Sequence, residues 1–442
     1  MSDQLNLKVK KALQAGRSGK FAKKTPYERF GFSQNPFRLD TDPDNPDFQI
    51  DREDVLLSFA AQVGNAIRLF EEDPVSQFRH LLSHGLRGCG KSSLARHFDR
   101  VWEQIGFQDY DTLYTDLKDW REPFEVQELS SSSKTLETYE RFLRKIMLIE
   151  KPLIVFIDNL DFTITGTPAI PRIKDFMSDI ETRAHNGFII IGFVQSLTLT
   201  VLLESEQQIL ARAFLSFFNP EHFFFPIFTK HEIRKLITSR VRISRIPTSL
   251  FSTKSIEIIA DHSLGIPTVA LNIATACLNE LIVQNADKVT IDIVNKVINQ
   301  FGFSEIVQLV DSIDKDSVDE TSTLMTPKRK EIIATVLGHQ IRELYFFPPT
   351  GSEGLRSSDL AELFGVNLST MNYHLKPLTT FQPIPILEAK DDVHDARSKI
   401  FCIDWDSPTS NALEVITVYQ NLKQEKYHVI PATIMLSRRE NP

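Results

Sequence analysis

The sequence predicts a parallel α/β core, followed by an all-helical unit and a smaller C-terminal unit of helices and a hairpin. Three observations support this fold class. A glycine-rich loop at 85–92 lies between an apolar, strand-sized run and residues at helical spacing. Two further apolar runs, 152–161 and 188–194, are short and end at polar residues, as buried parallel strands do. From residue 230 onward the apolar residues recur at helical spacing instead.

Composition narrows the class of protein. The chain has 442 residues, which suggests about three domains. Its net charge of −8 argues against nucleic-acid binding over the whole surface. The first 30 residues nevertheless hold eight Lys and Arg against two acids. We expect 1–26 to be a basic, flexible tail, which either is simply solvated or contacts phosphates without sequence preference.

Cysteine usage and hydropathy predict the compartment. The three cysteines, Cys89, Cys277 and Cys402, are far apart and lack the spacing of a metal site, which points to a reducing environment. No apolar run approaches the ~18 residues of a membrane span, and the N-terminal region lacks the apolar stretch of a secretory signal. We therefore expect a cytoplasmic protein without membrane contact.

The loop at 85–92, Gly-Leu-Arg-Gly-Cys-Gly-Lys-Ser, fits the phosphate-binding pattern G-x-x-x-x-G-K-[ST]. Its glycines let successive backbone N–H groups point into one concavity at the start of a helix, where an anion is favoured. We expect Lys91 to reach the β/γ-phosphates and Ser92 to bind Mg²⁺. A glycine-rich turn without a ligand is the alternative, which the strand expected at 78–83 and the following helix disfavour. The residues expected to contact the nucleotide are Gly85, Gly88, Cys89, Gly90, Lys91, Ser92 and Ser93.

The apolar run at 152–161, PLIVFIDNLD, ends in acids. Asp158 stands where the Mg²⁺-directed acid of a P-loop site belongs, although a strand that merely ends in a polar turn is the alternative. The run at 188–194 ends at Gln195 and Ser196, and a further strand is expected at 111–117. Alternating strands and helices of this kind predict a parallel sheet with ligands at the C-terminal ends of its strands.

The C-terminal unit spans 326–406 and follows an acidic, polar linker at 306–325. Thr326 can cap a helix, and Pro327 suits the first helical position. Three helices followed by a hairpin describe a winged helix-turn-helix. The expected helices are 327–344, 357–365 and 369–378, and the expected hairpin strands are 384–387 and 399–403.

The last helix of this unit carries residue types that can read DNA. Ser, Thr and Asn reach base edges or phosphates, and basic residues on the wing can take phosphates. The unit holds nine Lys and Arg against eleven acids, a balance that equally suits a protein-docking module. The residues expected to contact DNA are Ser369, Thr370, Asn372, Tyr373, Lys376, Arg397 and Lys399.

Together these motifs resemble the AAA+ ATPases of the origin-recognition/replication-initiator group. The loop at 85–92 matches the family's Walker A motif, and Asp158-Asn159-Leu160-Asp161 stands at its D-E-x-D Walker B motif. The stretch FGFSQNPF at 30–37 and the pair Arg52-Glu53 resemble the family's segment near the adenine. The resemblance implies an α/β P-loop NTPase core of the parallel-sheet, AAA+ type, an all-α lid and a C-terminal winged helix-turn-helix.

The resemblance also implies roles for individual residues. Gln195 or Ser196 falls at the end of the sensor strand, and Arg52 lies near the nucleotide. Arg212 lies in the stretch that carries an inter-subunit arginine, although an exposed helical arginine with no partner is the alternative. The implied catalytic set is Asp158, Asn159, Asp161, Gln195, Ser196 and, acting in trans, Arg212.

Two departures from the family pattern concern hydrolysis. The Walker B glutamate is Asn159 here, and an amide can position a water but cannot accept its proton. Asp161 corresponds to the family's own second acid, so it is not an obvious replacement. After Gly265-Ile-Pro267 the family usually continues with the sensor-two arginine, where this chain has Thr268. We therefore expect binding of ATP and Mg²⁺ with slow, switch-like hydrolysis.

The sequence thus predicts a core at 27–229, a lid at 230–305 and a C-terminal extension at 407–442 with a weak helix at 412–423. The expected function is an ATP-binding DNA switch, like a replication initiator or helicase loader. The expected partners are double-stranded DNA, at the nucleoid, and another copy or another AAA+ subunit in an ATP-dependent oligomer. The alternatives are a P-loop signal-transducing regulator of transcription or defence, and a nucleotide-dependent adaptor whose winged helix binds protein.

Overall fold

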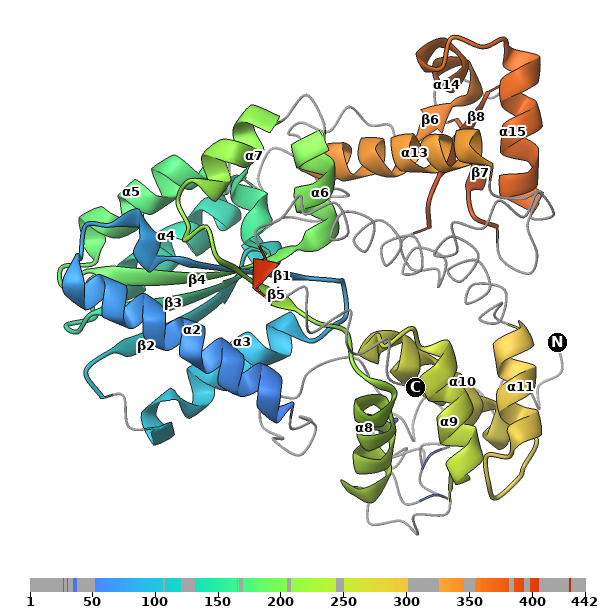
Figure 1. The fold of residues 1–442 in the computed structure, drawn as a ribbon, viewed down its shortest axis with the longest axis horizontal. Helices are drawn as coiled ribbons and strands as arrows, with labels where there is room; N and C mark the ends of the chain where they lie inside the picture. The colour runs from blue at the N-terminus through green and yellow to red at the C-terminus, as the bar shows by residue number, and fades with distance from the viewer. Residues whose placement is uncertain are drawn as a thin grey trace, which may run out of the picture.

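The computed structural model shows three groups of elements: a sheet with its helices, the helices α8 to α11, and a C-terminal unit around α15 (Figure 1). The predicted tail at 1–26, the linker at 306–325, the weak helix at 412–423 and Arg397 lie outside the described residues. The structure describes residues 27, 30, 35–37, 52–105, 108–120, 132–164, 166, 170–204, 208–243, 250–300, 326–345, 354–380, 385–392, 398–404 and 429–430.

The sheet of the core is parallel throughout its described strands. Its order is β2-β3-β4-β1-β5, so one strand, β4, separates the strand before the glycine-rich loop from the strand that ends at Asp158. The predicted α/β P-loop core is therefore confirmed. The strands are β1 (Leu81–Gly85), β2 (Asp111–Asp116), β3 (Leu153–Asp158), β4 (Phe188–Gln195) and β5 (His222–Phe225).

Two details of the sheet differ from the sequence prediction. The strand expected at 78–83 begins only at Leu81, because Gln77–Arg79 forms a 3-10 turn (η3) in which Phe78 is exposed. Although polar, Ser83 and His84 lie fully buried within β1. A short strand near the C-terminus, β9 (Val429–Ile430), pairs in parallel with β5 and was not predicted (Figure 1).

Aromatic packing holds the core helices against the sheet. Phe59 of α2 lies 5.0 Å from Phe98 of α3, 5.9 Å from Phe193 of β4 and 5.2 Å from Phe223 of β5, measured between ring centroids. Aromatic pairs at such distances contribute roughly 0.5–1.5 kcal/mol each beyond the area they bury. The core helices are α2 (Glu53–Glu72), α3 (Lys91–Val101), α4 (Ser132–Met147), α5 (Ile173–Arg183), α6 (Ser196–Glu204) and α7 (Gln208–Leu215), with 3-10 turns η4 (Trp102–Ile105), η5 (Leu117–Trp120) and η6 (Leu160–Thr163).

The all-helical group follows β5, as the apolar spacing predicts. Its longest member, α10, begins with Pro267 at the first helical position and buries most of its apolar residues. Thr229 and Glu232 form a reciprocal capping box at the start of α8. The helices are α8 (Lys230–Ile243), α9 (Thr253–His262), α10 (Pro267–Val283) and α11 (Ile291–Gln300).

The C-terminal unit has the predicted order of three helices and a hairpin. The first hairpin strand is shifted, since Ile386 and Leu387 enter the core of the unit and the strand begins at Glu388. A two-residue strand, β6, adds a third, antiparallel member that the sequence did not indicate. The elements are α13 (Pro327–Tyr345), β6 (Leu355–Arg356), α14 (Ser357–Leu363), α15 (Leu368–Thr380), β7 (Glu388–Asp391) and β8 (Lys399–Cys402).

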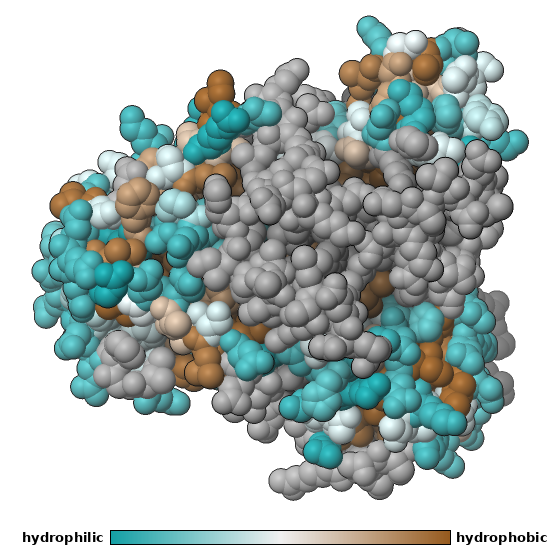
Figure 2. All heavy atoms as spheres, in the orientation of Figure 1, coloured by the Kyte–Doolittle hydropathy of each residue, from teal (hydrophilic) through white to brown (hydrophobic). Residues whose placement is uncertain are grey.

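The described surface drawn in Figure 2 is largely hydrophilic, with scattered hydrophobic residues over all three groups of elements. Within the described residues, no helix combines the length and apolar character needed to cross a membrane.

Candidate nucleotide site

The glycine-rich loop leaves the sheet at a crowded point. Gly85 ends β1 and pairs in register with Gln195 of β4 and Phe225 of β5. A Cβ on Gly85 would lie only 2.8 Å from the Cβ of Phe225, so this position requires glycine. Gly90 has φ +103° and directly precedes α3, whose N-terminus carries the positive end of the helix dipole. The predicted order of strand, glycine-rich loop and helix is confirmed, and its use as a phosphate site stays a prediction.

Lys91 lies inside the curve of this loop. Its Nζ donates to the carbonyl oxygens of Gly85 at 2.8 Å and Leu86 at 2.9 Å, and lies 4.0 Å from Cys89 Sγ. The side chain is only 8% exposed. A buried ammonium among backbone dipoles attracts anions, so the loop and Lys91 together fit a phosphate group.

Ser92 and Asp158, the two predicted Mg²⁺ ligands, are brought together. The Ser92 hydroxyl hydrogen bonds to the Asp158 carboxylate across the space between the loop and the end of β3. Burial raises the pKa of Asp158, and the Ser92 hydrogen bond and the Lys91 charge oppose that rise. A hydroxyl and a carboxylate are the hard oxygen donors that Mg²⁺ takes beside phosphate oxygens, so these residues fit the ion.

An acid that the sequence analysis missed, Asp116, completes the polar edge of the sheet. It ends β2, and the register places it opposite Asp158. Asn159 donates its Nδ2 hydrogen to Asp116 Oδ1 at 2.7 Å, and its backbone N–H donates to Asp158 Oδ1 at 3.0 Å. The run DTLYTD, which places an acid at the end of the neighbouring strand, was the signal available in the sequence.

The sensor residues lie at the end of β4. Gln195 is half-buried and stands beside Gly85 in the sheet, next to the phosphate loop. Ser196 is fully buried, and its Oγ lies 2.8 Å from His84 Nδ1. Burial, with the charges of His222 and Lys91, holds the pKa of His84 well below its usual range, so His84 is neutral at pH 7.

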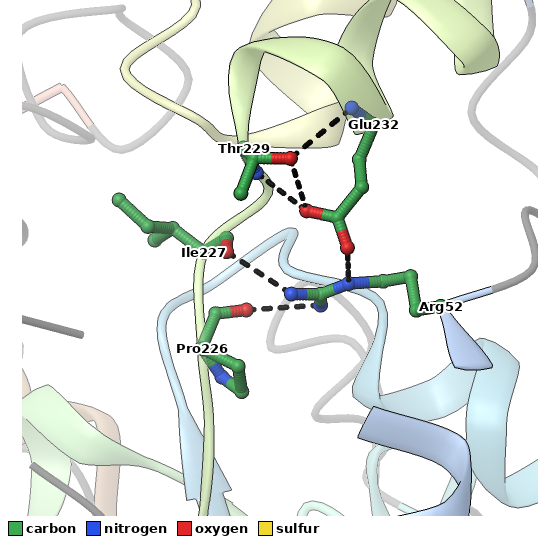
Figure 3. A network of polar contacts seen from close by, with 5 residues as sticks. All are labelled: Arg52, Pro226, Ile227, Thr229 and Glu232. Atoms are coloured by element: carbon green, nitrogen blue, oxygen red, sulfur yellow. Dashed lines mark hydrogen bonds and ion pairs between the residues drawn. The ribbon is translucent and has the colours of Figure 1, made fainter. Parts of the chain in front are cut away.

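Arg52, expected near the adenine, forms the network drawn in Figure 3. It donates to Glu232 Oε1 at 2.9 Å and to the carbonyl oxygens of Pro226 and Ile227 at 3.0 Å each. Although burial alone would raise the pKa of Glu232, Arg52 and Thr229 lower it. Arg52 thereby ties the start of α2 to the segment that joins β5 to α8. Its predicted contact with the nucleotide stays a prediction.

The remaining predicted residues are distributed as follows. Asp161 is fully buried in η6, and Arg212 is exposed on α7 one turn after the exposed Ile209. Of the residues predicted to contact DNA, Ser369, Asn372, Tyr373 and Lys376 are exposed on α15, Thr370 is half-buried, and Lys399 forms an ion pair with Asp391.

Comparisons with known proteins give similarities of structure only. No protein-family model and no curated protein matches this chain. The ORC1 protein of Aeropyrum pernix in complex with DNA is 15% identical, with a TM-score of 0.44 over 88% of this chain and 98% of that one. Drosophila ORC bound to DNA is 12% identical, with a TM-score of 0.42 over 92% and 99%. The RuvB Holliday junction branch migration motor of Thermotoga maritima is 17% identical, with a TM-score of 0.34 over 85% and 95%.

Proposed function

We propose that this protein is an ATP-binding switch of the AAA+ type whose C-terminal unit is a winged helix that contacts double-stranded DNA. The observation that carries the proposal is the convergence of Lys91, Ser92 and Asp158 at the ends of β1 and β3. Lys91 would take the β/γ-phosphates, and Ser92 and Asp158 would hold Mg²⁺. The role would be that of a replication initiator or helicase loader.

Contacts between the lid and the phosphate loop support the proposal that a nucleotide binds between the lid and the core. Thr268, at the start of α10, lies against Gly88 of the phosphate loop, so the lid reaches the loop directly. Arg52 and Glu232 hold the segment through which core and lid are connected. A nucleotide placed in the loop would therefore touch both parts and change how they pack.

The C-terminal unit is in contact with the core near the same site. Its first helix, α13, contacts α6, as Figure 1 shows. The first residue of α6 is Ser196, which follows Gln195 and is hydrogen-bonded to His84 of β1. A shift at the phosphate loop thus has a packed route to the C-terminal unit through α6, besides the route through the lid.

DNA contact is proposed through the exposed face of α15. Ser369, Asn372 and Lys376 present hydroxyl, amide and ammonium groups on that face. Tyr373 is 69% exposed, and Arg329 lies 5.8 Å from its ring centroid. Polar, cationic and aromatic groups of this kind contact phosphates and bases.

Two observations favour a nucleotide-dependent adaptor, in which the C-terminal unit binds protein. Leu363, at the end of α14, and Leu368, at the start of α15, are 65% and 49% exposed, which makes the ends of the turn between these helices unusually apolar for a DNA-binding surface. On the wing, Lys399 is paired with Asp391, which reduces the charge available for phosphates. A signal-transducing P-loop regulator would share the same nucleotide site.

The distinguishing experiment measures binding to a random DNA duplex at increasing salt, with and without Mg²⁺ and ATP. The proposal expects binding that weakens steeply with salt and changes with ATP. Absent or salt-independent duplex binding, with ATP binding intact, would favour the adaptor.

A further inference from the structure

The pair formed by Asn159 and Asp116 fixes the orientation of an amide. Asn159 stands where the Walker B glutamate is expected, and its Nδ2 lies 2.7 Å from Asp116 Oδ1. A carboxylate can only accept at neutral pH, so the NH₂ group of Asn159 must face Asp116. Its carbonyl oxygen, Oδ1, is therefore directed away from Asp116.

Both members of the pair are held in place by the backbone. The backbone N–H of Lys118 donates to Asp116 Oδ1 at 2.9 Å, and that of Asn159 donates to Asp158 Oδ1 at 3.0 Å. Asn159 has φ +54° and ψ +38°, a left-handed conformation that asparagine adopts more readily than most residues. The amide is thus pre-oriented beside the predicted Mg²⁺ ligand.

We propose that Asp116 is a positioning residue for ATP hydrolysis: it holds the Asn159 amide so that Oδ1 accepts a hydrogen bond from the attacking water. This inference rests on the proposed function of the site. An amide that orients water without taking its proton is sufficient for phosphoryl transfer, in which positioning and charge stabilisation supply most of the catalysis.

The reaction balances without a protein base. The water oxygen forms a bond to the γ-phosphorus, and the bond between that phosphorus and the β,γ-bridging oxygen breaks with its electron pair going to ADP. The proton lost by the water is taken up by the released phosphate. Asp116 and Asn159 therefore end the reaction in the states in which they began it.

The same geometry accounts for the missing glutamate. A carboxylate at position 159 in this conformation would face the carboxylate of Asp116 across a hydrogen-bond distance, and like charges so close disfavour each other. Asp116 with Asn159 is a matched pair, whereas Asp116 with an acid is not.

The test is a double-mutant cycle on the full chain with Asp116→Ala, which removes the acceptor oxygen, Asn159→Gly and the double variant. Glycine suits φ +54°, so Asn159→Gly removes the amide without backbone strain. The matched control is Asp119→Ala, at an exposed acid in the same segment. Three quantities are measured: single-turnover hydrolysis of ATP with Mg²⁺, the affinity for ATP with Mg²⁺, and stability to denaturant without nucleotide.

We expect each single variant to lower the hydrolysis rate about 10- to 100-fold with ATP affinity changed less than about 3-fold. The double variant should be no slower than the slower single variant, because Asp116 acts only through Asn159. The two substitutions should also be non-additive in stability without nucleotide. Asp119→Ala should leave all three quantities unchanged.

The inference would be overturned by losses of rate that multiply in the double variant, by an unchanged rate in Asp116→Ala, or by a loss of ATP affinity as large as the loss of rate. A wild-type protein that binds ATP but never hydrolyses it would also overturn it, while leaving nucleotide binding intact. A wild-type protein that binds no ATP would instead refute the proposed function. The affinity measurement distinguishes this outcome from a failure of the inference.

Discussion

Thr268 of α10 and Gly88 of the phosphate loop are packed so closely that a Cβ on Gly88 would lie 2.1 Å from Thr268 Oγ1. Gly88 also has φ +77°, in the left-handed region that favours glycine. Thr268 stands where the family resemblance places a sensor arginine. Instead of a long cation reaching towards a phosphate, this chain has a short hydroxyl side chain that lets the lid touch the loop.

Gly88→Ala should therefore weaken ATP binding. The added methyl strains the backbone by about 1–3 kcal/mol and also displaces Thr268, and with it the start of α10. Titration with ATP and Mg²⁺ measures the loss, which we expect to be at least about 10-fold. Gly365→Ala is the control, because Gly365 has φ +59° but no atom within 4 Å of an added Cβ. Equal ATP affinity in the two variants would show that the contact with Thr268 is unimportant.

Arg52→Ala should destabilise the protein. Its guanidinium is 5% exposed and holds both Glu232 and two backbone carbonyls, so its removal leaves a buried carboxylate without its partner. Losing one member of a buried pair costs about 3–5 kcal/mol. Denaturant unfolding at pH 7 measures this cost. Lys230→Ala, which breaks the exposed pair of Lys230 with Asp261, should cost less than about 1 kcal/mol.

The same pair predicts a pH dependence. The pKa of Glu232 is lower in the folded protein than its ordinary value of 4.5, so the unfolded chain binds the proton more tightly. The stabilisation by Arg52 is fully present above pH 4.5 and is lost as the pH falls through the lower, folded pKa. The difference in unfolding free energy between wild type and Glu232→Gln should accordingly shrink below pH 4.5. A constant difference from pH 7 to pH 3 would contradict this assignment.

Ser196→Ala should uncouple the C-terminal unit from the nucleotide. The substitution removes the hydrogen bond to His84 but leaves Lys91, Ser92 and Asp158 in place. Hydrogen exchange of the α13 amides, measured with and without ATP and Mg²⁺, should change by roughly 5-fold or more in wild type and less in the variant. Ser263→Ala, which removes a buried hydroxyl bonded to Ala260 in the lid, is the control. An identical change in hydrogen exchange in wild type and Ser196→Ala would show that the hydrogen bond at the start of α6 does not connect the nucleotide site to α13.

Lys376→Ala should weaken binding to random duplex and reduce the slope of log affinity against log salt by about 0.9, as for one lost phosphate contact. Lys399→Ala should have a smaller effect, because Lys399 is already paired with Asp391. Fluorescence anisotropy with a labelled duplex at several salt concentrations measures both. A larger effect at Lys399 than at Lys376 would move the proposed DNA contact from α15 to the wing.

The sequence was most informative where a single residue type is required at a fixed spacing. Gly85, Lys91, Ser92 and Asp158 were predicted as one group because loop curvature, phosphate charge and Mg²⁺ each restrict the residues allowed, and the structure brings them together at the ends of β1 and β3. The boundaries of β1 and of the hairpin were less predictable. His84, for example, is polar but pairs with β4 inside the sheet, and this pairing cannot be recognised from the sequence of β1 alone.

Contacts between distant segments could not be predicted. Asp116 and Asn159 are 43 residues apart, and only the register of β2 with β3 brings them together. Arg52 was expected near the nucleotide because the pair Arg52-Glu53 resembles the family's segment near the adenine. Its partners Pro226, Ile227 and Glu232 lie more than 170 residues further along the chain.

Lys91 and the residues around it are proposed to bind ATP with Mg²⁺. Isothermal titration calorimetry of the full chain with ATP and Mg²⁺ tests this directly, comparing wild type with Lys91→Ala and with Lys118→Ala, at an exposed lysine in η5. We expect saturable binding by wild type and Lys118→Ala, and a loss of affinity of at least about 100-fold in Lys91→Ala, as for a lost charge-assisted contact of about 3 kcal/mol. Equal ATP affinity in wild type and Lys91→Ala, with both proteins folded, would contradict the account.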